Sequence, residues 1–148
     1  MSAEFKKSKC GFITKALSPP GGYIRTFINC AQDAGIPLNP VFFMSIGEAY
    51  KNGVPESLGD MISPDPSVVV GIRRCAMNAT GLVLPDMSLD HKSVANALIE
   101  ASGGSPYGNA VAAAVTSCPK PRLYKMADYM SCLKKNCVDS LVPPAVSP

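Results

Sequence analysis

The sequence has few of the residues on which metal sites and many catalytic sites depend. It contains no tryptophan, few aromatic residues and a single histidine, His91. No two cysteines form a CxxC pair, so we do not expect a zinc site. His91 lies between Asp90 and Lys92 at the start of a predicted helix, where an exposed structural role is expected, and no close pair of acidic residues suggests acid–base catalysis. We therefore predict a protein that is not an enzyme, with no catalytic residue, no cofactor and no metal ligand.

Charge and long apolar runs are also scarce. The formal net charge of the 148-residue chain is only +3, and its basic residues are scattered. A nucleic-acid-binding domain usually has a much stronger basic face, so no nucleic-acid partner is expected. No apolar run approaches the length that spans a bilayer, and we predict no stable membrane insertion.

Short helical segments separated by proline and glycine make up the rest of the sequence. The length suits a single domain over residues 1–148, and an apolar fraction of 47% is typical of a globular protein. Apolar residues recur at three- and four-residue steps, as in Val68, Ile72, Cys75 and Ala76, which predicts an all-α fold of six to seven short helices. We place the helices at 3–16, 22–34, 39–51, 66–79, 88–102, 107–118 and 121–138, with 139–148 as a proline-rich C-terminal tail.

Six cysteines indicate a disulfide framework. The first residues, MSAEFKKSK, contain no apolar signal segment, and we interpret the chain as a mature secreted domain of the extracellular fluid that follows an initiator methionine. Asn78-Ala79-Thr80 is a glycosylation sequon that matters only in the secretory pathway. The cysteines are Cys10, Cys30, Cys75, Cys118, Cys132 and Cys137.

Cys132 and Cys137 lie on one predicted helix, and helix geometry separates their Cα atoms by about 8–9 Å. A disulfide reaches about 7 Å, so each of the two needs another partner. This argument leaves many of the 15 connectivities of six cysteines open.

Two segments resemble the insect odorant-binding protein family. Residues 75–83 (CAMNATGLV), followed by Leu89-Asp90 and a helix to Cys118, are similar to the second half of such proteins. Residues 126–133 (MADYMSCL) are similar to the helix with the family's last cysteine. The resemblance covers roughly residues 28–138. It places the family's second cysteine at Gly71 and the fifth at Leu123, so both halves of one bridge are missing, as in the cysteine-poor subclass.

The resemblance implies a disulfide pattern and a function. The implied bridges are Cys30–Cys75 and Cys118–Cys132, with Cys10–Cys137 as an additional terminal bridge. The implied function is a secreted carrier that binds a small hydrophobic molecule, such as an odorant, a pheromone or a fatty-acid-like ligand, in an internal apolar cavity. A membrane receptor is a candidate partner, and the protein is expected to be a monomer or a weak homodimer.

Apolar residues on the helical stripes are the candidate ligand contacts. Flexible methionines beside phenylalanine and small aliphatic residues suit a pocket that adapts to its ligand. Tyr50, Tyr107, Tyr124 and Tyr129 are candidate hydroxyl anchors, and Arg73 or Arg74 could hold a carboxylate. The alternative is a secreted interaction protein, such as an inhibitor, toxin or immune effector, with a filled core. The predicted ligand-binding residues are Phe42, Phe43, Ile46, Met61, Val69, Ile72, Val94, Leu98, Val111, Val115, Leu123, Met126 and Met130.

Overall fold

The computed structural model describes residues 3–141, and the regular elements in this range are helices. An isolated antiparallel bridge joins Val83 to Leu89 in the loop before α6. In chain order the elements are α1 (Ala3–Cys10), α2 (Phe12–Ala16), α3 (Tyr23–Asp33), α4 (Pro40–Lys51), the 3₁₀ helix η1 (Pro55–Met61), α5 (Pro66–Ala79), α6 (His91–Ala101), α7 (Pro106–Ala113), the 3₁₀ turn η2 (Arg122–Tyr124) and α8 (Met126–Ser140).

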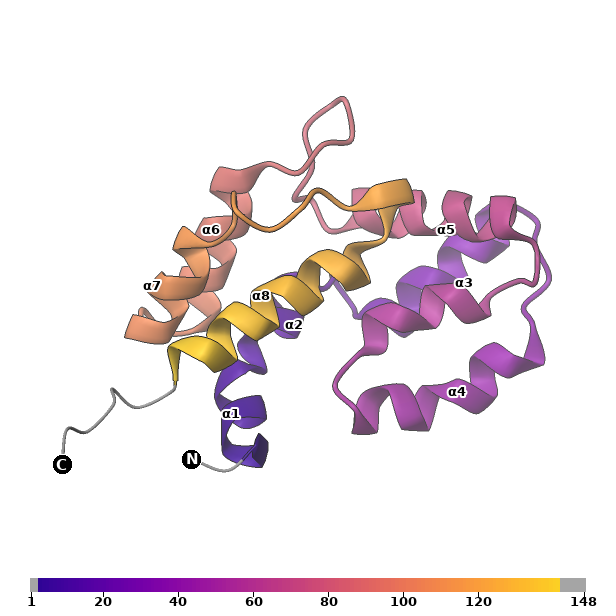
Figure 1. The fold of residues 1–148 in the computed structure, drawn as a ribbon. Helices are drawn as coiled ribbons and strands as arrows, with labels where there is room; N and C mark the ends of the chain where they lie inside the picture. The colour runs from indigo at the N-terminus through magenta and orange to yellow at the C-terminus, as the bar shows by residue number, and fades with distance from the viewer. Residues whose placement is uncertain (1–2, 142–148) are drawn as a thin grey trace, which may run out of the picture.

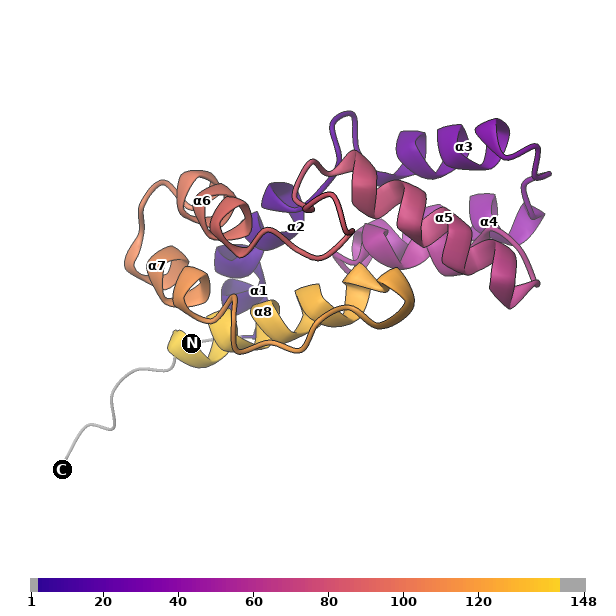
Figure 2. The same cartoon turned by 90° about the horizontal axis from the view of Figure 1, so that it is seen from above.

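The helices pack in two groups that α8 connects. One group contains α1, α2, α6, α7 and α8, and the other contains α3, α4, α5, η1 and η2. Figures 1 and 2 show the groups at opposite ends of the molecule, with α8 running along both. Helix α8 contacts α1, α2 and α7 in its own group and η1 in the other. Helix α8 therefore lies at the boundary between the two groups.

Proline and a polar cap start three of the helices. Pro40, Pro66 and Pro106 are the first residues of α4, α5 and α7, where a missing N–H costs nothing. The side chain before each proline accepts a hydrogen bond from a free backbone N–H; for α5, Asp65 accepts from Ser67 N at 3.0 Å. The start of α5 at Pro66 confirms the helix that the sequence predicts there.

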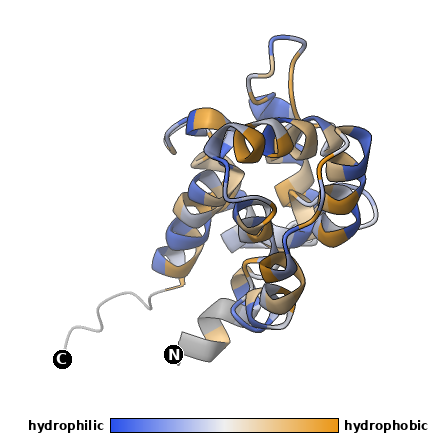
Figure 3. Cartoon of the chain, turned by 90° about the vertical axis from the view of Figure 1, so that its right-hand side faces the viewer, coloured by the Kyte–Doolittle hydropathy of each residue, from blue (hydrophilic) through white to orange (hydrophobic). Residues whose placement is uncertain are grey.

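A continuous apolar core runs through both groups. Its fully buried side chains include Phe42 and Leu58 in one group, Leu98 and Val111 in the other, and Met130 on α8. Figure 3 shows hydrophobic and hydrophilic stretches alternating along the helices, as expected where each helix buries one face. Short helices such as these are marginal alone, so this shared core stabilises them together.

The structure confirms the all-α fold and corrects several boundaries. The predicted helix over 3–16 is broken at Gly11, a poor helix former, into α1 and α2. The predicted helix over 121–138 begins only at Met126, because Leu123 and Tyr124 have positive φ angles of 49° and 61°. It also continues through Ser140 into the predicted tail, while residues 142–148 of that tail lie outside the described range.

Other corrections follow from local signals. The prediction over 88–102 starts too early, because the cap Asp90 sets the start of α6 at His91. The prediction over 107–118 ends too late, since α7 gives way to turns after Ala113. The 3₁₀ helix η1 follows a stretch that the sequence indicates only as a Gly/Pro break.

All six cysteines form disulfides, in the pattern that the resemblance implies. Cys10–Cys137 joins α1 to α8, Cys30–Cys75 joins α3 to α5, and Cys118–Cys132 joins the segment after α7 to α8. As the geometric argument requires, Cys132 and Cys137 have different partners. Each disulfide lies within one group of helices. Apart from the backbone segments that connect the two groups, the contacts between them are therefore noncovalent.

Candidate functional site

An open groove of about 750 Å³ crosses the boundary between the two groups of helices. We call it the α8 groove. Its walls are α1 and α2 on one side, the turn between α4 and η1 on the other, and α8 along its length. Most of the lining surface is apolar, and the volume is within the range of pockets for small molecules. The lining residues are Ser8, Cys10, Gly11, Thr14, Tyr50, Lys51, Asn52, Gly53, Val54, Pro55, Ser131, Lys134, Lys135 and Val138.

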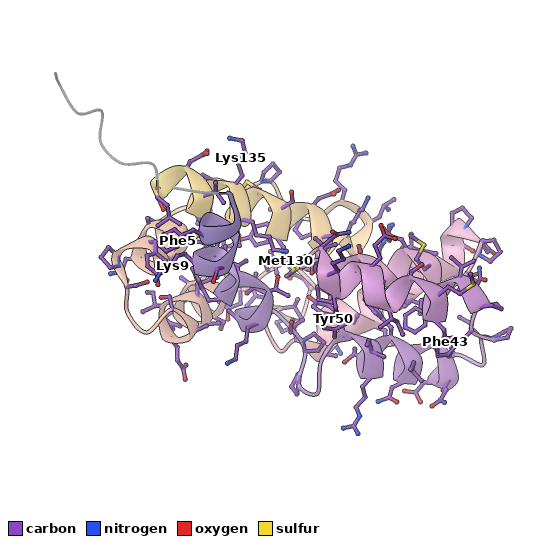
Figure 4. All side chains as sticks on the ribbon, turned by 90° about the horizontal axis from the view of Figure 1, so that it is seen from below. Phe5, Lys9, Phe43, Tyr50, Met130 and Lys135 are labelled. Atoms are coloured by element: carbon purple, nitrogen blue, oxygen red, sulfur yellow. A yellow bond between two sulfur atoms is a disulfide. The ribbon has the colours of Figure 1, made fainter. Side chains whose placement is uncertain are left out.

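Figure 4 shows this side of the molecule from below. Phe5 and Lys9 lie on α1, and Tyr50 and Phe43 lie toward the other group of helices. Lys135 projects from α8, and the fully buried Met130 lies between α1 and Tyr50 in this view. The Nζ atom of Lys9 lies 5.3 Å from the centroid of the Phe5 ring, so these two residues of α1 make a cation–π contact.

Two kinds of link hold the groove walls in place. The Cys10–Cys137 disulfide fixes α1 to α8. On the opposite wall, Gly53 turns the chain with a φ of +70°, which a residue with a side chain rarely adopts. The Gly53 carbonyl accepts hydrogen bonds from Lys134 Nζ at 3.0 Å and from Thr14 Oγ1 at 3.5 Å. The turn is thereby attached to both α8 and α2.

A buried ion pair lies below this wall. Lys134 Nζ is 2.6 Å from Glu56 Oε1, and the Glu56 side chain is only 2% exposed. The other carboxylate oxygen, Oε2, is buried and has no hydrogen-bond partner among the described atoms. A buried carboxylate is costly unless it is paired, so Lys134 stabilises η1 against α8. This pair is a buried polar contact between the two groups of helices.

A narrow cleft of about 20 Å³ lies on the far side of Glu56, bordered by α3, α5 and the start of α8. It has room for about one water molecule. Arg73 Nη2 and Nε donate to the same oxygen of Asp60 in this cleft, at 2.7 and 3.0 Å. Burial, and after it the charge of Glu56, raises the pKa of Tyr23 well above its usual range. Tyr23 therefore stays neutral and donates to Leu17 O at 3.0 Å.

The predicted ligand contacts do not line the α8 groove. Nine of them are buried in the core: Phe42, Val69, Ile72, Val94, Leu98, Val111, Val115, Met126 and Met130. Ile46 is half-buried, while Phe43, Met61 and Leu123 are exposed at 52%, 39% and 65%. Met126 alone of this set borders the cleft. Leu123, which has a positive φ, lines neither the groove nor the cleft. A ligand-binding role for the predicted residues stays a prediction.

The predicted polar anchors divide between the site and the scaffold. Tyr50 lines the groove and Tyr124 lines the cleft. Tyr129 is buried and donates to Val115 O at 2.8 Å, and burial raises its pKa to about 12. Tyr107 packs against Phe12, with ring centroids 5.8 Å apart. Arg73 pairs with Asp60, and Arg74 lies 5.9 Å from the centroid of the Tyr124 ring.

Apart from Tyr50, sequence reasoning named none of the groove-lining residues as a ligand contact, and it also missed the residues that hold the groove wall, Lys134, Glu56 and Gly53. Glu56 and Lys134 are separated by 78 residues, and no local pattern pairs them. The Gly53 to Pro55 break does signal a turn, but nothing in the sequence shows that its carbonyl faces α8.

The metal-ligating side chains within residues 3–141 do not come together in a group of three or more. His91 is half-buried at the first position of α6. No helix in the described range is both long and apolar enough to cross a membrane. Asn78, in the sequon, is exposed near the end of α5.

Comparison of the chain with models of protein families, with curated proteins and with solved structures finds no match.

Proposed function

We propose that the protein is a non-enzymatic carrier that binds a small hydrophobic molecule in the α8 groove. The observation that carries this proposal is a mostly apolar space of about 750 Å³ whose walls are fixed by a disulfide and a buried ion pair. Fixed walls reduce the ordering cost of binding, and transfer of apolar surface out of water provides the driving force. The resemblance implies an enclosed internal cavity, which stays a prediction; the present proposal rests on the open groove.

The polar groups of the groove suit a ligand with one polar end. The Tyr50 hydroxyl and the Lys51 ammonium stand near the α4–η1 turn, while Val54, Pro55 and Val138 provide apolar contact. A ligand with an oxygen at one end and a hydrocarbon body fits this distribution. Three disulfides are compatible with secretion, and we place the function in an oxidising extracellular fluid.

Displacement of the fluorescent probe N-phenyl-1-naphthylamine by alcohols, aldehydes, esters and fatty acids tests the proposal. Ser131 is exposed and lines the groove, so Ser131→Trp fills the space without disturbing the core. Asn96 is exposed on α6 away from the groove, which makes Asn96→Trp the matched control. We expect the wild type and the control to bind the probe alike, and Ser131→Trp to bind it at least about tenfold more weakly.

Two results would contradict the proposal. If the wild type does not bind the probe, the alternative of an interaction protein without a ligand site is favoured. If both tryptophan variants bind as tightly as the wild type, a ligand binds outside the groove. Because the natural sequence has no tryptophan, the introduced residue is also a single fluorescent reporter of ligand in the groove.

A further inference from the structure

The narrow cleft on the far side of Glu56 contains a hydrogen-bonding atom that the described chain does not satisfy. Glu56 lines the cleft, and its side chain is only 2% exposed. Its Oε1 atom is paired with Lys134, which lines the α8 groove and not the cleft. Oε2, the oxygen that remains for the cleft, is buried and finds no donor within residues 3–141. Buried polar atoms almost always have a partner, so Oε2 points to a donor from outside the chain.

The size of the cleft limits what this donor can be. A volume of about 20 Å³ holds one water-sized group and excludes a larger organic ligand. The cleft and the α8 groove share no lining residue, so a ligand in one does not occupy the other. The donor is therefore a single small molecule or ion, and its site is independent of the proposed carrier function.

Charge favours a neutral donor over a cation. The two acidic residues that line the cleft are each already paired, Glu56 with Lys134 and Asp60 with Arg73. Lys125 also lines the cleft and adds a further positive charge. A free cation in the cleft would therefore face Arg73 and Lys125 and would find no unpaired carboxylate.

The hydrogen-bonding groups around the cleft suit a water molecule. A buried water typically makes about three hydrogen bonds. The Tyr23 hydroxyl lines the cleft and donates to Leu17 O, so its oxygen is left to accept. Burial, and after it the charge of Glu56, raises the pKa of Tyr23, which indicates that the two groups lie near each other. Arg73 uses Nε and Nη2 on Asp60, which leaves Nη1 as a donor.

We propose that the cleft is a binding site for one water molecule, which donates to Glu56 Oε2 and to the Tyr23 hydroxyl and accepts from Arg73. The water extends the ion pair of Lys134 with Glu56 into a polar chain that runs from α8 through η1 to α3 and α5. Because Pro55 of η1 lines the α8 groove, this water also helps to hold one wall of the groove.

Nuclear Overhauser effects between water and isotope-labelled methyl groups test the site in solution. Met77 and Met126 line the cleft, whereas Leu98 is fully buried in the other group of helices. In the natural protein we expect cross-peaks from water to Met77 and Met126, with the sign of a long-lived contact, and none to Leu98. Met44, which is 81% exposed, is the control for surface water, whose contacts are too short-lived to give that sign.

A double variant separates bound water from the hydroxyl groups of the cleft. The hydroxyls of Tyr23 and Thr80 exchange with water and could relay the same cross-peaks. Glu56→Leu with Lys134→Met removes the carboxylate and its partner but keeps both hydroxyls. Replacement of a buried ion pair by apolar side chains is often neutral for stability, so this variant is expected to fold. The cross-peaks to Met77 and Met126 should disappear in it.

Thermal unfolding in ammonium chloride and in tetramethylammonium chloride, at equal ionic strength, separates water from a cation. Ammonium is about the size of water, whereas tetramethylammonium is too large for the cleft. The same difference in Tm between the two salts for the natural protein and the double variant supports water. A gain in ammonium chloride that only the natural protein shows would assign the site to a cation and overturn the proposal. Cross-peaks that are absent from the natural protein, or that persist in the double variant, overturn it equally.

Discussion

Replacing Lys134 by methionine tests whether the ion pair with Glu56 holds η1 against α8. Methionine keeps most of the length and the apolar stem of lysine but removes the charge. Glu56, whose side chain is 2% exposed, would lose its 2.6 Å partner, and its other oxygen already has none within the described range. The Gly53 carbonyl would retain only the 3.5 Å bond from Thr14.

Removal of one partner from a buried pair costs about 3–5 kcal/mol. The Lys134 side chain is 23% exposed, so water reaches its end of the pair, and we expect the lower figure of about 3 kcal/mol. For a chain of this length each kcal/mol lowers Tm by about 3 °C, which gives a fall of about 9 °C at neutral pH. The measurement is urea or thermal unfolding followed by far-UV circular dichroism, with the disulfides intact.

The next residue provides the control. Lys135 pairs with Asp139 at 2.9 Å on the same helix, but the two side chains are 78% and 61% exposed. Lys135→Met should therefore change stability by less than about 0.5 kcal/mol. The double variant Glu56→Gln with Lys134→Met removes both charges and should recover most of the loss. Equal effects of the two lysine variants would refute the view that burial of Glu56 makes Lys134 important.

Three further outcomes follow from the same structure. Gly53→Ala places a side chain at a φ of +70° and should destabilise the fold by about 1 kcal/mol. Gly47→Ala, within α4 and in open space, should instead stabilise it by about 0.5–1 kcal/mol. Thermal unfolding of the two variants measures the difference. Replacing Cys10 and Cys137 together by serine should lower the free energy of unfolding by about 5 kcal/mol in the loop-entropy model, because the bridge closes a sequence separation of 127. Urea unfolding tests this value. Burial raises the pKa of Tyr129 to about 12, whereas tyrosines of the unfolded chain ionise near pH 10. The unfolded chain therefore loses this proton first, and the free energy of unfolding should fall between about pH 10 and about pH 12. Tyr129→Phe has no such proton, so its alkaline unfolding should lack this fall.

Local signals in the sequence account for most of the helices. The prediction over 66–79 coincides with α5, because a capping aspartate and Pro66 mark its start and an apolar stripe runs along it. The same signals, a capping side chain and a first-position proline, place α4 to within a residue, whereas α3 starts after Gly22 without a side-chain cap. The predicted helix boundaries are wrong where the backbone conformation departs from what the local sequence pattern indicates. A stripe that continued through Leu123 suggested a longer helix, but the positive φ angles at Leu123 and Tyr124 turn the chain before α8 begins.

The candidate site could not be predicted in the same way. Its walls come from segments far apart in the chain, and the sequence does not show which faces of α1 and α8 the fold leaves open. The apolar stripes correctly mark core residues such as Leu98 and Met130, but good burial is also the reason that these residues are not in the groove. Sequence periodicity separates buried from exposed positions, but it does not predict where two packed groups of helices leave a space between them.

Helix α8 connects these observations. It bears the second cysteine of two disulfides, Cys132 and Cys137, and both of them hold it to the group of helices at the N-terminal side of the groove. Its contact with the other group depends on Lys134 and on Met130, whose sulfur lies 3.5 Å from the Tyr23 hydroxyl. The Cys10–Cys137 disulfide thus fixes one wall of the groove to α8, while noncovalent contacts fix the other. Noncovalent contacts open at a lower free-energy cost than disulfides, so the α4–η1 turn is the less firmly held of the two walls, and the Lys134–Glu56 pair is the contact on which its position depends.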